Sequence, residues 1–109
     1  MRILHCLSQL PMKTGSGVYY DTVIAYMRQF GHENAALYGV QEPFAPAPAC
    51  SMAFPVQFNT DSLPFPVPGM SDEMPYPSTV YSEMTDEQIT VYRTAFRRRL
   101  EEAKRIFQP

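Results

Sequence analysis

The sequence has little of what several classes of protein require. It contains only two cysteines, Cys6 and Cys50, and their spacing matches no metal-ligand pattern. Neither of its two histidines belongs to a set of plausible ligands with metal-binding spacing, so nothing indicates a metal site. No apolar run approaches the roughly 20 residues of a membrane-spanning helix. We therefore expect neither a disulfide scaffold nor a zinc module nor a membrane span.

An excess of charge of either sign is also missing. The formal net charge is −2, and most of the basic residues fall in one predicted helix, where acidic residues alternate with them. A nucleic-acid groove needs an unbalanced basic stripe, so we expect no nucleic-acid partner. The opening residues Met1–Leu10 lack the long apolar core of a secretory signal, because His5 and Gln9 interrupt it. We expect a cytoplasmic location and two free thiols, with a Cys6–Cys50 disulfide as the alternative.

What is present fits one small α/β domain. Residues Arg2–Leu7 form a short apolar run that predicts a strand buried on both faces. A loop over Ser8–Ser16 leads into a helical pattern that closes at Gly31, and Asn34–Val40 predicts a second strand. Strand, helix and strand within about 40 residues predict a βαβ unit with parallel strands. One buried stripe is expected on that helix, formed by Val18, Tyr19, Tyr20, Val23, Ile24, Met27 and Phe30.

Proline dominates the middle of the chain. Nine of the eleven prolines lie between Pro43 and Pro77, which predicts a long loop from about residue 41 to 84. Within it, Ser51–Phe58 predicts a third short strand, and Pro55 requires an edge position or a bulge. The loop is too apolar for a disordered linker, so we expect it to be ordered and to lie over a site.

The last segment predicts a long amphipathic helix. Thr85 and Gln88 form a capping-box pattern at its start. The basic residues on its other side predict a solvated face, with an acidic partner or anionic substrate as the alternative. Its apolar residues predict one continuous buried stripe: Ile89, Tyr92, Phe96, Leu100, Ala103 and Phe107.

A glycine-bearing turn, Gly15-Ser16-Gly17, lies between the first strand and the first helix. Backbone amides at a helix N-terminus attract phosphate, and glycine permits close approach of a ligand to the backbone. The alternative is that the two glycines only allow the chain to turn. The dinucleotide fingerprint is not met, because Tyr20 occupies its third glycine position and Gly15 comes too late after the strand. The phosphate-loop motif is absent as well.

Taken together, these motifs resemble the N-terminus of GT-B glycosyltransferases of the group called glycosyl transferases group 1, or family 4. The resemblance rests on the strand opening Met1–His5, the loop Pro11–Gly17 with its glycine pair, and the helix that closes on Phe30-Gly31-His32. It also rests on the proline-rich stretch Leu63–Thr79, followed by the helix Thr85–Phe107, which is similar to one bacterial subgroup.

The resemblance implies a Rossmann-like domain that faces a second domain across a cleft. In that family the second domain holds most nucleotide-sugar contacts, including a Glu-x7-Glu pattern. The sugar donor is a substrate, and no cofactor is implied. Transferred to this sequence, the donor-phosphate loop is Lys13, Thr14, Gly15, Ser16 and Gly17. The acceptor-side loop is Gly69, Met70, Ser71 and Asp72, with Tyr76 as a stacking surface or as simple loop packing.

We therefore expect residues 1–109 to form the N-terminal segment of a GT-B domain: α/β, partial, Rossmann-like, three-layered, with a short parallel sheet that is incomplete at the C-terminus. The expected function is the acceptor-side segment of a retaining, nucleotide-sugar-dependent hexosyltransferase, inactive without its C-terminal domain and with no catalytic residue identified. The alternatives are a small non-catalytic α/β binding or interaction module and, less well supported, another nucleotide-dependent enzyme. An exposed sheet edge predicts low stability or dimerisation through that edge.

Overall fold

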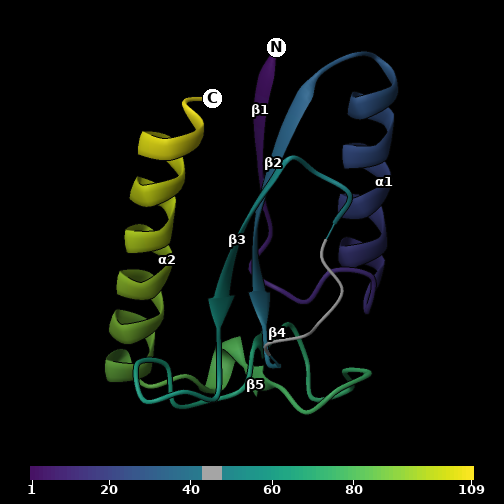
Figure 1. The fold of residues 1–109 in the computed structure, drawn as a ribbon. Coiled ribbons are helices and arrows are strands. Elements are labelled where there is room, and N and C mark those ends of the chain that lie inside the picture. The colour runs from purple at the N-terminus through teal and green to yellow at the C-terminus, as the bar shows by residue number, and fades with distance from the viewer. Residues whose placement is uncertain (43–47) are drawn as a thin grey trace.

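The computed structural model describes residues 1–42 and 48–109. They form three layers, with a three-stranded parallel sheet between helix α1 and helix α2 (Figure 1). The sheet order is β1 (Arg2–Cys6), β2 (Glu33–Val40), β3 (Met52–Gln57), so β2 is central. This is the α/β architecture of a partial Rossmann-like domain, as the sequence predicts.

The central strand β2 is buried on both faces, which explains its almost wholly apolar sequence. Ala35 and Leu37 belong to the core between the sheet and α2, whereas Ala36, Tyr38 and Val40 belong to the core between the sheet and α1. Successive residues of a strand point to opposite faces, so one strand supplies both layers of packing.

Helix α1 (Gly15–Gln29) has Thr14 as its N-cap residue. It ends before Gly31, whose φ of 83° is the left-handed conformation expected there. The prediction of one buried stripe along this helix was wrong in part. Tyr20 and Ile24 are buried, but Tyr19 and Phe30 are 71% and 72% exposed, and Val18 is exposed as well. Apolar residues occupy two sides of the helix, and the sheet covers only one of them.

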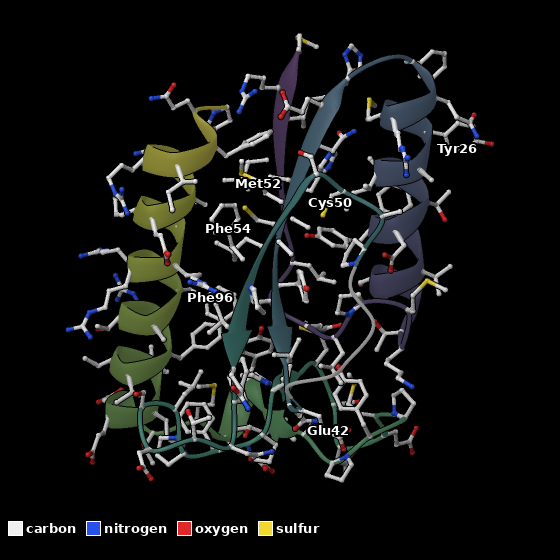
Figure 2. All side chains as sticks on the ribbon, viewed as in Figure 1. Tyr26, Glu42, Cys50, Met52, Phe54 and Phe96 are labelled. Carbon is white, nitrogen blue, oxygen red and sulfur yellow. The ribbon has the colours of Figure 1, made fainter. Side chains whose placement is uncertain are left out.

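Helix α2 (Asp86–Phe107) has the predicted capping box. The Thr85 hydroxyl accepts from the Gln88 amide at 3.1 Å, and the Gln88 side chain accepts from the Thr85 amide at 2.9 Å. Ala103 and Phe107 are buried, and Figure 2 shows Phe96 on the side of α2 that faces the sheet.

The predicted stripe of α2 needs one correction. Ile89 and Leu100 are exposed, whereas Val91 and Ala95 pack against the core. The contacting face of the helix is therefore rotated toward Val91 and Ala95, and Ile89 and Leu100 lie at its margin.

The proline-rich stretch is more regular than one long loop. Besides β3 it contains β4 (Pro68–Gly69) and β5 (Thr79–Val80), a parallel pair, followed by the 3-10 helix η1 (Tyr81–Glu83). It lies across the carboxyl end of the main sheet (Figure 1) and extends the core with buried apolar side chains. Residues 43–47 of the predicted loop lie outside the described residues. The buried apolar side chains that follow β3 in the proline-rich stretch are Phe58, Leu63, Phe65, Val67 and Pro68.

The two outer strands of the sheet have different edges. Pro55 lies in the middle of β3, an edge strand as predicted, and its carbonyl accepts from Arg99 Nε at 3.0 Å. β1 contains no proline, and no strand of the described residues pairs with its outer side. Within the same residues, no helix is long and apolar enough to cross a membrane.

Candidate functional site

An open hollow of about 530 Å³ lies between the carboxyl half of β1 and the amino-terminal half of α1. It exists because β1 is an edge strand, so no strand within residues 1–42 and 48–109 closes the space under the helix. Gly15 contributes to the opening, since a Cβ at this position would meet no atom within 4 Å. The lining residues are His5, Cys6, Leu7, Gly15, Ser16, Tyr19, Tyr20 and Val23.

Tyr20 joins the helix to the two strands beneath it. Its hydroxyl donates to the carbonyl oxygens of His5, at 2.9 Å, and Leu37, at 3.0 Å. Burial, with a smaller contribution from the neighbouring Cys6 thiol, raises the pKa of Tyr20 well above its usual value. The phenol therefore remains a neutral donor at physiological pH and holds the inner wall of the hollow in place.

The ionisable groups of this wall offer no ready nucleophile. Partial desolvation raises the pKa of the Cys6 thiol even though the residue is exposed, so the reactive thiolate is disfavoured at neutral pH. His5 Nε2 lies 2.8 Å from Asn34 Oδ1. The Asn34 amide nitrogen donates to the His32 carbonyl, which leaves Oδ1 as the acceptor and makes His5 Nε2 the donor. The arrangement suits binding better than covalent chemistry.

The glycine turn at the start of α1 has one buried residue, Gly17, and two exposed residues, Gly15 and Ser16. Gly17 is buried, and its amide donates to Thr14 Oγ1 at 3.1 Å. Thr14 in turn donates to Gln9 Oε1 at 3.1 Å, so its hydroxyl is engaged as the helix cap. Gly15 and Ser16 are exposed at the rim of the hollow. As the first two helical residues, they have amides without an intrahelical partner.

Of the five residues predicted for a donor-phosphate loop, the structure thus places Gly15 and Ser16 at the hollow. Lys13 is exposed but does not line it, and Thr14 and Gly17 serve the helix start. The close approach that requires Gly17 is made by the chain itself, because a Cβ there would lie 2.6 Å from the Leu10 carbonyl oxygen.

The predicted acceptor-side residues lie elsewhere at the carboxyl end of the sheet. Gly69 is buried in β4 against the Met74 side chain, while Met70, Ser71 and Asp72 are exposed. The Tyr76 ring packs against the main core. Its hydroxyl is buried without a hydrogen-bond partner among the described residues, and burial raises its pKa. None of these residues lines the hollow.

A hydrogen-bonded chain of hydroxyls fixes the segment that covers this end of the sheet. Ser8 Oγ, directly after β1, lies 2.9 Å from Tyr81 Oη, which lies 3.2 Å from Tyr92 Oη of α2. Burial raises the pKa of Tyr92 far above its usual value, so this hydroxyl stays uncharged within the hydrogen-bonded series. The series links the residue after β1 to η1 and α2, and Ser8 and Tyr81 are 73 residues apart in the sequence.

Sequence reasoning missed most of the residues that line the hollow. His5, Leu7 and Tyr20 were expected as strand or helix core, and Tyr19 as part of a buried stripe. The available signal was the apolar circumference of α1, which is wider than one sheet face can cover.

Comparison with protein families, with curated proteins and with solved structures finds no match for this chain.

Proposed function

We propose that this chain is the acceptor-side, N-terminal segment of a nucleotide-sugar-dependent glycosyltransferase of the GT-B type. The observation that carries the proposal is the position of the Gly15 and Ser16 amides at the rim of the hollow beside β1. Ligands of open α/β sheets bind outside the carboxyl ends of the strands, and this hollow lies at the carboxyl half of β1. The resemblance of the sequence to that family supports the same assignment.

The amino-terminal end of α1 suits a diphosphate. The two amides point outward from the positive end of the helix dipole, and anions are stabilised there. The Lys13 ammonium, two residues before Gly15, adds a positive charge near this end of the helix. Tyr19 is 71% exposed and lines the hollow, so its ring offers a flat apolar surface to a sugar or a base.

In this proposal the chain binds and orients a donor but does not transfer sugar by itself. Glycosyl transfer requires stabilisation of an oxocarbenium-like centre and of the departing diphosphate. Two amides, one lysine and an uncharged wall of tyrosine and thiol meet little of that requirement. The second domain of a GT-B enzyme supplies the remainder, without a cofactor. Retention of configuration, the hexosyltransferase class and a cytoplasmic location are parts of the same proposal.

The amide site can be tested by one pair of variants. Gly15→Pro removes one amide hydrogen and keeps the helix, because proline is favoured at the first helical position and Thr14 before it is extended. Gly15→Ala keeps the amide and adds a methyl group in open space. The probes are pyrophosphate and UDP, followed by the amide shifts of the ¹⁵N-labelled chain.

We expect both probes to shift the Ser16 amide in the wild type and in Gly15→Ala, with affinity at least tenfold weaker in Gly15→Pro. Equal binding by Gly15→Pro and Gly15→Ala would show that these amides do not hold the anion. An absence of amide shifts at Gly15 and Ser16 at any probe concentration would contradict the proposed donor side.

A second function, a non-catalytic interaction module, is favoured by a different observation. Three aromatic side chains of α1 and its cap, Tyr19, Tyr26 and Phe30, are more than half exposed. A soluble small-molecule enzyme has no need of such a surface, whereas a docking module has. Protein association without any anion binding would favour this alternative.

A further inference from the structure

The second apolar side of α1 forms one surface with the free edge of β1. Tyr19, Val23, Tyr26 and Phe30 follow one another at steps of four, three and four, so they share one side of the helix. Tyr19 and Val23 line the hollow together with β1 residues, which places this side of α1 over the open edge of the sheet. Tyr26, on the same side of the helix, is 56% exposed.

The outer edge of β1 presents unpaired backbone groups. The Met1 carbonyl accepts from the Glu33 amide and the Leu7 amide donates to the Leu37 carbonyl, so odd-numbered residues bond to β2. Because strand residues alternate, the amides and carbonyls of Arg2, Leu4 and Cys6 point to the other side. No described strand pairs with them.

The two edges of the sheet differ in how well they are protected. In β3, Pro55 lacks an amide hydrogen and its carbonyl is taken by Arg99. In β1 the one charged side chain is Arg2, and its guanidinium is bound to Glu33 and to the Phe107 carbonyl. The β1 edge therefore has neither a proline nor a free charge that would discourage pairing.

We propose that two copies of this chain associate through the β1 edge, with their β1 strands antiparallel about a two-fold axis. The result is a continuous six-stranded sheet with the two α1 helices side by side. The partner of this surface is a second copy because the surface is self-complementary, as a two-fold interface requires.

Both the β1 strands and the α1 helices are complementary to their own copies in this arrangement. An axis through Leu4 places Leu4 opposite the partner's Leu4, and Arg2 opposite the partner's Cys6, so that all outward backbone groups are paired. The same axis makes the α1 helices antiparallel. The protruding Phe30 at one end of the helix then meets the partner's hollow beside Gly15 and Tyr19 at the other end.

The estimated contact area reaches the lower limit for a specific dimer. Tyr19 and Phe30 are 71% and 72% exposed, and together expose about 300 Å² per protomer. Counting both protomers and adding Val23 and the paired strand edges, the contact reaches about 1,000 Å², the size expected of a biological interface. The net charge of −2 per chain opposes association only weakly.

This inference goes beyond the proposed function and rests on the β1 edge and Phe30 instead of the Gly15 and Ser16 amides, but the two proposals are coupled through the hollow. The partner's Phe30 fills the hollow, so a ligand in the hollow and the dimer exclude each other. Added ligand then shifts the equilibrium toward monomer by mass action.

The test is sedimentation equilibrium of the full chain from about 1 to about 100 μM, a range that covers weak and moderate dimers. One variant changes the helix part of the proposed interface and one changes the strand edge. Phe30→Lys places a cation at the helix C-terminus, where it is favourable for the monomer. Cys6→Pro removes one outward amide hydrogen and leaves the ladder to β2 intact. Ile106→Lys, an exposed apolar position on α2, is the matched control.

We expect a dimer in the wild type and in Ile106→Lys, and at least a tenfold weaker dimer in both interface variants, with unchanged circular dichroism. A wild type that is monomeric throughout overturns the proposal. So does a dimer that neither Phe30→Lys nor Cys6→Pro weakens, since association then uses another surface. If Cys6→Pro does not fold, the comparison of Phe30→Lys with Ile106→Lys still decides the matter.

Discussion

Gly17→Ala should destabilise this protein strongly, although alanine is the better helix former. A Cβ at position 17 would lie 2.6 Å from the Leu10 carbonyl oxygen and 2.8 Å from the Met12 amide nitrogen. Both are backbone atoms, so neither can move aside by a rotamer change. Either α1 must lift from the loop or the loop must deform, and both changes disturb the Thr14–Gly17 hydrogen bond.

The magnitude follows from opposing terms. Alanine gains about 1 kcal/mol over glycine from helix propensity. Overpacking costs up to about 3 kcal/mol in a close-packed interior, and loss of the cap costs about 1 kcal/mol more. We expect a net loss of about 2 to 3 kcal/mol in the free energy of unfolding. For a domain of this size, that lowers the melting temperature by roughly 10 °C or more.

Gly15→Ala is the matched control, because the same substitution two residues earlier meets open space. It should leave the melting temperature unchanged or raise it slightly. Urea titration followed by circular dichroism measures both variants against the wild type. If Gly17→Ala is as stable as Gly15→Ala, the close approach of α1 to the Leu10–Met12 loop is refuted.

Three further predictions concern the helix cap of α2, the buried Phe107 and the partly buried carboxylate of Asp21. Thr85→Ala removes the capping hydroxyl and should lower the free energy of unfolding by about 1 kcal/mol, whereas Thr85→Ser should restore it in the same urea titration. Phe107→Ala empties a fully buried site and should cost about 3 to 5 kcal/mol, against less than about 1 kcal/mol for the exposed Ile106→Ala; similar melts would contradict the burial of Phe107. Burial raises the pKa of Asp21 above 3.8, so the folded state holds its proton more tightly and stability should fall as the pH rises from 3.8 through that raised pKa. Asp21→Asn should remove this loss, as melting temperatures from pH 3 to 7 can show.

Local sequence patterns predicted most of the secondary structure. The strands β1, β2 and β3 and both helices lie within two residues of their expected ranges. The signals were short-range: apolar runs for the strands, the Thr85–Gln88 capping box for α2 and Gly31 for the end of α1. Each depends on residues a few positions apart, so no knowledge of the tertiary fold is needed.

The pair β4–β5 gave no such signal. Each strand has only two residues, and β4 begins with Pro68, a residue type that disfavours a strand in any local analysis. The pair forms because the hydrophobic segment around it packs over the end of the main sheet, with the Thr79 amide bonded to the Val67 carbonyl. Long-range packing therefore overrode local preference.

The sequence by itself determined the order and type of the main elements and the placement of the glycine turn between β1 and α1. Only the tertiary structure decided which side of α1 the sheet covers and that an apolar hollow adjoins the free edge of β1. It also decided that Gly17 packs against the Leu10–Met12 backbone, whereas Gly15 and Ser16 are exposed. The physical reason is that periodicity reports how many sides of a helix are apolar, whereas burial depends on which neighbouring strands are present to cover them.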